Sequence, residues 1–175
     1  EGRTPNNTVN PDALDFYYSG LQLYADSFRE NGSIVSAREA LRAAVELEPE
    51  FSEAWSALVK AGIYWSSGPL ARDKTAFIRQ LERDIQRALE LNPFDPSLHA
   101  ALVSWHARTT LDLDLAHHHL AEAERLAPNA VDTLLAGGTY FWVIGAGDKS
   151  IELYLRAQRQ DPLNTPLKFS VAQRQ

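Results

Sequence analysis

The sequence contains no cysteine and no methionine. Without cysteine the chain cannot form disulfides, cysteine-ligated zinc sites or a thiolate nucleophile. Because methionine is also absent, the sequence does not begin at a natural start codon, and we expect a fragment or a processed chain. Neither absence decides the cellular compartment, although a cytoplasmic location is favoured over a periplasmic one.

Long apolar runs are missing as well. The longest uncharged stretch covers residues 133–147, which is 15 residues including four glycines. A membrane-spanning helix needs about 20 consecutive apolar residues. No basic segment followed by an apolar core opens the chain, as it would in a signal peptide. We therefore expect no membrane insertion within this chain.

Basic residues are outnumbered, since 17 Lys and Arg against 23 Asp and Glu give a net charge of -6. Affinity for nucleic acid depends on clustered Lys and Arg, so this balance argues against a nucleic-acid partner. The hydrophobic content is 45% and charges of both signs are interspersed, which is typical of a chain that folds. Its 175 residues suffice for one compact domain or a short repeat array.

Four prolines recur at the ends of helical blocks. Pro49, Pro93, Pro128 and Pro162 are separated by 44, 35 and 34 residues, and a spacing near 34 indicates an internal repeat. Before each proline, small or apolar residues recur at intervals of 4, 3 and 5, which places them on one helical face. We expect the alanines of this face to be buried where two helices cross. They are Ala44, Ala88, Ala123 and Ala157.

Another helical stripe precedes each of these helices, so each unit is predicted to be a helical hairpin. In the first unit the stripe is Leu21, Tyr24, Ala25 and Phe28, and small residues recur in the other units. The polar residues 1–10 have no hydrophobic period and are expected to be a disordered lead-in to a single domain at 11–175. That domain is predicted to contain hairpins near 11–47, 51–91, 96–126 and 130–160, and a fifth helix at 165–175.

The second unit carries an insertion, "SSGPLARDKTAFIRQ", at residues 66–80. Gly68 and Pro69 break the chain, and helical spacing resumes from about Ala71. We expect a second helix of about 20 residues there, about ten longer than usual, which adds roughly 15 Å at 1.5 Å per residue. This extension is either a tolerated elongation or a platform for a neighbouring domain.

These columns resemble the tetratricopeptide repeat (TPR) family over about residues 11–162, although only the second unit has Trp in the bulky column of the first helix. The resemblance implies an all-α, right-handed α-solenoid of antiparallel helical hairpins. Such units stack into a superhelix, and their first helices line its concave side. It also implies a non-catalytic scaffold that binds a peptide or a partner protein segment on the concave face.

Aromatic and basic residues flank the packing stripes of the first helices, and such residues are the usual anchors of protein interfaces. The predicted partner-binding residues are Lys60, Tyr64, Trp105, Arg108 and Trp142. Alternatively, Trp105 and Trp142 fill gaps between neighbouring hairpins. The carboxylate clamp of some family members is not expected here, because Asp26 in a matching column would repel a carboxylate.

A narrower resemblance leaves a second function open. The first helix "NPDALDFYYSGLQLY" and the ending "DPLNTP" are similar to repeat domains fused to bacterial nucleotide cyclases or winged-helix regulators. This likeness implies a sensory or regulatory domain of a larger bacterial signalling protein.

No motif indicates catalysis or a cofactor. The stretch "VIGAGDKSI" lacks both glycines that a phosphate loop requires, and we expect Gly145 to lie in a hairpin turn. His117, His118 and His119 point about 100° apart on a helix, so they cannot converge on one metal ion and are expected to face outward. The carboxylates are interpreted as solvated faces. We therefore expect no enzyme activity, no cofactor and no metal.

Overall fold

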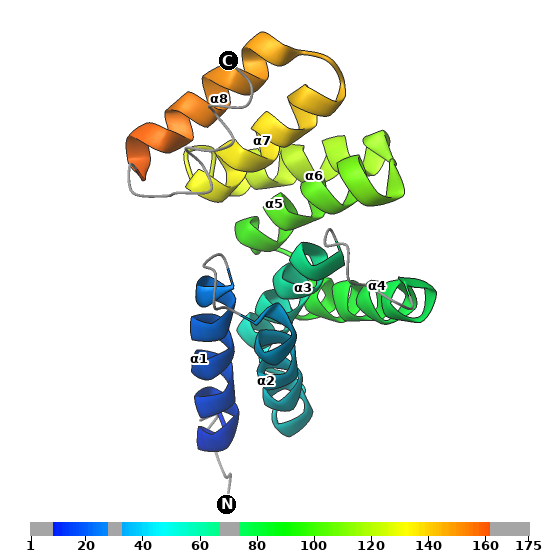
Figure 1. Cartoon of the computed structure of the whole chain (residues 1–175), viewed down its shortest axis with the longest axis vertical. Helices are drawn as coiled ribbons and strands as arrows, with labels where there is room; N and C mark the ends of the chain where they lie inside the picture. The colour runs from blue at the N-terminus through cyan, green and yellow to red at the C-terminus, as the bar shows by residue number, and fades with distance from the viewer. Residues whose placement is uncertain (1–8, 28–32, 67–73, 162–175) are drawn as a thin grey trace, which may run out of the picture. The chain divides into compact units, whose positions relative to one another are not determined.

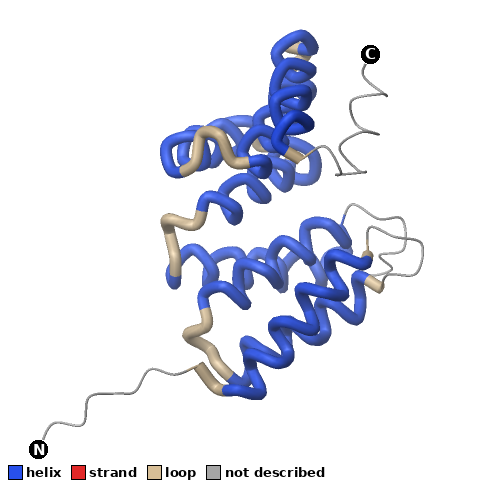
Figure 2. Tube along the Cα trace, turned by 90° about the vertical axis from the view of Figure 1, so that its left-hand side faces the viewer, coloured by secondary structure: helices blue, strands red, loops and turns tan. Residues whose placement is uncertain are grey.

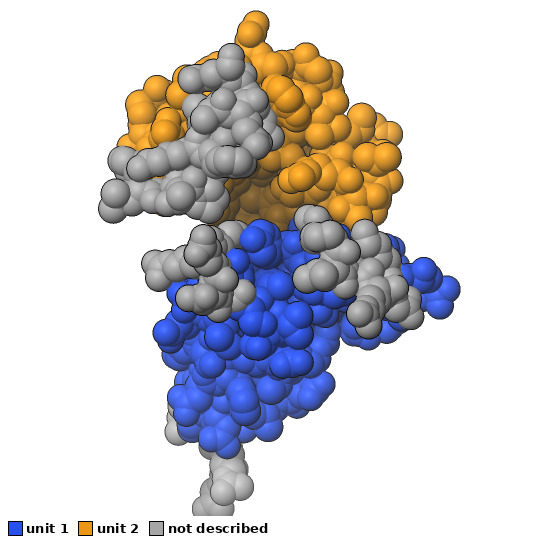
Figure 3. All heavy atoms as spheres, in the orientation of Figure 1, with its two compact units in different colours: residues 1–92 blue, residues 93–175 orange. Residues whose placement is uncertain are grey.

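The computed structural model describes residues 9–27, 33–66 and 74–161, and every regular element in these ranges is helical (Figures 1 and 2). The all-α fold class is thereby confirmed. Residues 1–8 of the expected lead-in, the expected helix at 165–175 and most of the insertion break lie outside the described residues. The chain divides into two compact units, Glu1–Asn92 and Pro93–Gln175 (Figure 3).

The first unit contains two helical hairpins. Helix α1 (Pro11–Asp26) packs against α2 (Ile34–Leu47), and α3 (Ser52–Ser66) packs against α4 (Lys74–Leu91). Because α2 also packs on α3, the two hairpins share one interior (Figure 1). These bounds agree with the hairpins expected near 11–47 and 51–91.

Short polar residues define where the helices of the first hairpin begin. The side chain of Asn10 accepts a hydrogen bond from the backbone N–H of Asp12 at 2.9 Å. Ser33 caps α2 by accepting from the backbone N–H of Ser36 at 3.3 Å. Such caps satisfy N–H groups that have no partner inside the helix. The second helix then stops before Pro49, as expected from the helix-breaking effect of proline.

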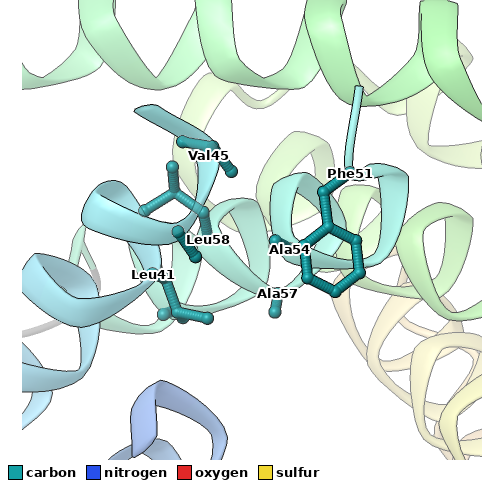
Figure 4. Close-up of a cluster of buried hydrophobic side chains, with 8 residues drawn as sticks. Leu41, Val45, Phe51, Ala54, Ala57 and Leu58 are labelled. Carbon is teal, nitrogen blue, oxygen red and sulfur yellow. The ribbon is translucent and has the colours of Figure 1, made fainter. Parts of the chain in front are cut away.

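The core of the first unit forms where α2 meets α3. Figure 4 shows Leu41 and Val45 of α2 together with Phe51, Ala54 and Leu58, all of which are buried. Burying a side chain of the size of leucine stabilises a fold by about 1.5–3 kcal/mol. The packing of α2 on α3 is therefore the main hydrophobic contact between the two hairpins.

Gly20 lets α1 approach α2 closely. A Cβ atom at position 20 would lie 2.6 Å from Cγ of Leu41 and 3.3 Å from the carbonyl oxygen of Ala37. Ala25, which the sequence pattern places on the packing stripe, is exposed, so that expectation was wrong.

Helix α4 is longer than the other second helices, as the insertion predicts. It has 18 residues, whereas α2, α6 and α8 have 14 each. The excess within the described residues is four (18 − 14), and positions 71–73, where the longer helix is expected to begin, lie outside them.

The second unit also contains two hairpins. Helix α5 (Pro96–Trp105) continues into a π-helical turn, η1 (His106–Thr110), and packs against α6 (Leu113–Leu126). The second hairpin of this unit pairs α7 (Val131–Val143) with α8 (Gly147–Gln160), and α5 also packs on α7. These bounds agree with the hairpins expected near 96–126 and 130–160.

The turn between α7 and α8 settles the role of "VIGAGDKSI". Gly145 has φ of +83°, a left-handed conformation that glycine adopts without strain. The ammonium group of Lys149 lies 3.8 Å from the ring centroid of Phe141, and the hydroxyl of Ser150 donates to the carbonyl of Gly138 at 2.7 Å. The residues that a phosphate loop would turn towards a ligand are thus used to close a hairpin.

Small residues mark the helix crossings of both units. In the second unit, Cβ atoms at Gly137 and Gly138 would lie 2.9 Å from the side chains of Leu153 and Tyr154. The alanines expected at the crossings are all buried, with exposures of 0% for Ala44, 1% for Ala88, 0% for Ala123 and 0% for Ala157. The predicted register of the second helices is therefore confirmed.

Candidate functional site

In the first unit, the predicted binding residues Lys60 and Tyr64 lie on α3. Their i, i+4 spacing places both side chains on the same side of the helix. Tyr64 is 39% exposed, and Lys60 is half-buried. This side of α3 therefore combines an accessible aromatic ring with a positive charge.

Tyr24 of α1 supports Tyr64 from the neighbouring hairpin. The two rings meet edge-on, with centroids 6.0 Å apart and an interplanar angle of 84°. Edge-to-face pairs of this kind contribute about 0.5–1.5 kcal/mol beyond the burial of their area. Since Tyr24 also packs on the core of the unit, it limits the orientations available to the Tyr64 ring.

In the second unit, Trp105 does not lie on an accessible surface. It is the last residue of α5 and only 1% exposed, which places it among the largest fully buried side chains. A ring that is covered on all sides cannot contact a partner segment unless the unit rearranges. Of the two roles considered for Trp105, its burial favours packing over partner binding.

Arg108 and Trp142 of the second unit are accessible. Arg108 lies in η1 and is exposed, and Trp142 lies in the last turn of α7 with 46% exposure. Because η1 packs against α7, the helical segments that carry the two residues are neighbours. The second unit therefore exposes a cation on η1 and an aromatic residue on the neighbouring α7.

Two further apolar residues next to Trp142 were not predicted as binding residues. Val143 is 38% exposed and Ile144 is 44% exposed, so Trp142–Ile144 form an exposed apolar run that we term the α7-end patch. Consecutive large apolar side chains on a surface are typical of interaction sites. The signal in the sequence is the apolar run directly before the turn glycine Gly145.

A buried carboxylate in the first unit was also unexpected. Asp84 of α4 is 4% exposed, and the guanidinium of Arg42 from α2 donates to both of its carboxylate oxygens, to Oδ1 at 3.1 Å. The side-chain amide of Gln80 donates to the same Oδ1 at 2.8 Å. The interpretation of the carboxylates as solvated faces was therefore wrong for Asp84, which ties α2 to α4.

Arg38 forms a second link in the same region. Its guanidinium lies 4.4 Å from the ring centroid of Phe77 and 5.0 Å from that of Trp65. Burial lowers the pKa of Arg38, and the nearby Arg42 lowers it further. Cation–π contacts of this kind join α2 to α3 and to α4.

Histidines gather in the third hairpin. Nδ1 of His99 lies 2.9 Å from Nδ1 of His119, and Nε2 of His99 lies 3.0 Å from the carbonyl oxygen of Pro93. The ring of His106 stacks on that of His119, with centroids 5.4 Å apart and planes 12° apart. His119 is only 7% exposed, so the expectation that it faces outward was wrong, whereas His117 and His118 are exposed as expected.

The surroundings of His119 oppose its protonation. The pKa of His119 is lowered to about 4, chiefly by burial and additionally by His99, His106 and His118, while Glu122 acts in the opposite sense. Burial also lowers the pKa of His106. Across residues 9–27, 33–66 and 74–161, no three His, Asp or Glu side chains are grouped so as to hold a metal ion. Within the same ranges, no helix is both long enough and apolar enough to cross a membrane.

Comparisons with known proteins agree with this architecture. Residues 19–61, which cover α2 and parts of α1 and α3, match the family model of the tetratricopeptide repeat. A solved structure described as a thermophilic TPR protein of Thermus thermophilus is similar with a TM-score of 0.72 and 18% sequence identity, covering 94% of this chain and 81% of that one. A comparison with curated proteins gave no match. The chain therefore has a fold similar to that of a tetratricopeptide-repeat protein, and its residues 19–61 match the repeat itself.

Proposed function

We propose that this chain is a non-catalytic protein-interaction scaffold that binds an extended segment of a partner protein on its concave face. The TPR fold supports an interaction scaffold in general. The observation that carries the finer proposal is the α7-end patch, because Trp142, Val143 and Ile144 are each at least 38% exposed. Leaving such side chains in water is unfavourable unless another surface covers them.

Within this proposal, aromatic rings anchor the partner and cations orient it. Tyr64 and Trp142 supply large, rigid contact areas, which lose little conformational entropy on binding. Lys60 on α3 and Arg108 on η1 supply donors for carbonyl or carboxylate groups of the segment. Trp105 is omitted from the binding residues because of its burial.

The experiment combines partner identification with quantitative binding. A partner is first captured from the native host, and a synthetic peptide of its binding segment is then titrated calorimetrically into wild type, Trp142→Ala and Tyr64→Ala. Loss of a true anchor costs about 2 kcal/mol or more, which is roughly a 30-fold weaker Kd. Tyr18→Ala is the matched control, since Tyr18 is an aromatic residue with 62% exposure on α1.

A double variant provides the decisive result. Trp142→Ala with Arg108→Ala should keep the helical content of wild type, because both side chains are exposed. If this well-folded variant binds the peptide with full affinity, the proposed residues do not form the site. The alternative function, a sensory or regulatory domain of a larger signalling protein, gains no support from the described residues or from the comparisons.

A further inference from the structure

All five histidines of the chain lie between positions 99 and 119, and four of them are in ring contact in the third hairpin. We term this group the histidine cluster, and its members are His99 of α5, His106 of η1, and His118 and His119 of α6. None of them is among the proposed partner-binding residues. The first unit contains no histidine at all, so only the second unit can respond to histidine titration.

Hydrogen bonding determines where the protons of the central pair lie. The carbonyl oxygen of Pro93 can only accept, so Nε2 of His99 must carry a hydrogen and donate to it. A neutral His99 then has a bare Nδ1, which accepts the hydrogen of Nδ1 of His119 at 2.9 Å. This buried hydrogen bond links α5 to α6 and requires at least one neutral ring.

The pair cannot hold its contact once both rings are charged. An imidazolium carries a hydrogen on each nitrogen, so two charged rings would direct two N–H groups at each other. Only one hydrogen fits between nitrogens that are 2.9 Å apart. In the unfolded chain nothing prevents both rings from binding protons near the ordinary histidine pKa of about 6.5. Acidification therefore favours a state in which this contact is broken.

The neighbouring groups do not compensate a charge on His119. His106 stacks on it from η1, and His118 lies beside it with ring centroids 5.3 Å apart. The one carboxylate that favours its charged form, Glu122, is already paired with Arg125 at 2.8 Å. Asp112 raises the pKa of His106 but does not act on His119. On α7, the ring of Tyr140 lies beside His117, with ring centroids 5.8 Å apart.

We propose that the histidine cluster is a pH-sensitive latch, which holds α5 to α6 while at least one ring of its central pair is neutral and releases this hairpin when both rings are protonated. The turn η1 belongs to the latch, because it carries the His106 ring that covers His119. A π-helical turn is a frequent location for functional changes in a helix. Leu111, whose backbone has a left-handed conformation with φ of +59°, follows η1 directly.

The test on the wild-type full chain is native-state hydrogen exchange at pH 7.0 and 5.5, corrected for the intrinsic exchange rates. For one group whose pKa moves from 6.5 when open to about 4 when closed, the opening constant should rise about eightfold between these pH values. The rise is expected for amides of α5 and α6, whereas α1 and α2 serve as internal controls without histidine. An equal change in both units, or none in α5 and α6, would overturn the proposal.

Two variants and one titration make the assignment specific. His119→Asn keeps an N–H donor near the position of Nδ1 but cannot become charged, so the eightfold rise should fall to less than twofold. His118→Asn changes an exposed neighbour on the same helix and should keep the behaviour of wild type. If His119→Asn fails to fold, NMR titration of the histidines in the wild-type chain tests the latch instead. The latch requires His119 to titrate far below 6.5, and an ordinary titration of His119 with α5 and α6 still protected would refute it.

Discussion

Replacing Gly20 by alanine tests the closest approach of two helices in the first unit. Gly20 lies inside α1, where an exchange of glycine for alanine normally stabilises a helix by about 0.5–1 kcal/mol. Here the added Cβ would lie 2.6 Å from Cγ and 2.8 Å from Cδ2 of Leu41. Two opposing effects therefore act at one position, and the packing decides which one prevails.

The magnitude follows from how little room Leu41 has. Its side chain is 0% exposed and belongs to the core cluster of the first unit, so it cannot rotate into solvent. The carbonyl oxygen of Ala37, at 3.3 Å from the same Cβ, limits the alternative of shifting α1 sideways. Overpacking of this kind costs about 1–3 kcal/mol, which exceeds the gain in helix propensity. We expect a net loss of about 1–2 kcal/mol in the free energy of unfolding.

The assay is urea unfolding at pH 7 followed by far-UV circular dichroism, with Gly147→Ala as the matched control. Gly147 begins α8, and a Cβ added there meets nothing within 4 Å. Gly147→Ala should therefore leave the unfolding midpoint unchanged or raise it, whereas Gly20→Ala should lower it. A Gly20→Ala variant as stable as wild type would show that α1 does not contact α2 in the manner described.

Three other outcomes are expected. Asp84→Ala leaves the half-buried guanidinium of Arg42 without its carboxylate partner and should cost about 2–3 kcal/mol in urea unfolding; a loss below about 0.5 kcal/mol would contradict the buried pair. Ala123→Leu overpacks a fully buried crossing and should cost about 1–3 kcal/mol by the same assay, whereas unchanged stability would show that the register of α6 is incorrect. Because the pKa of folded His119 is lowered to about 4, its contribution is complete above pH 6.5 and is lost as the pH falls from 6.5 to 4, at most about 3 kcal/mol. Unfolding series at pH 7, 5.5 and 4 check this window, and a stability that rises on acidification would contradict it.

The hairpin architecture could be predicted from the sequence because its signals are local. Helix starts and stops depend on residues within one turn, such as the cap at Ser33 and the break at Pro49. The face that a helix buries is recorded in its own periodicity, so Ala44 and Ala157 could be assigned to crossings. Because of the repeat near 34 residues, each of these local patterns occurs four times, which strengthens the prediction.

The candidate site was predicted only in part, because accessibility depends on what covers a side chain. Tyr64, Arg108 and Trp142 are exposed, and Lys60 is half-buried, whereas Trp105 is buried. In the sequence pattern, Tyr64, Trp105 and Trp142 all lie beside the packing stripe of their helices. Only the packing of neighbouring helices distinguishes an exposed ring from a buried one.

Tertiary structure alone decided the environment of the polar groups. Asp84 is buried because Arg42, 42 positions away, reaches its carboxylate, and His119 is buried because His99, 20 positions away, offers it a hydrogen-bond partner. Burying a polar group is favourable only when such a partner is present, and helical periodicity contains no information about partners on other helices. The sequence therefore determined the helices and their hairpins, whereas the contacts between helices determined which polar residues became part of the interior.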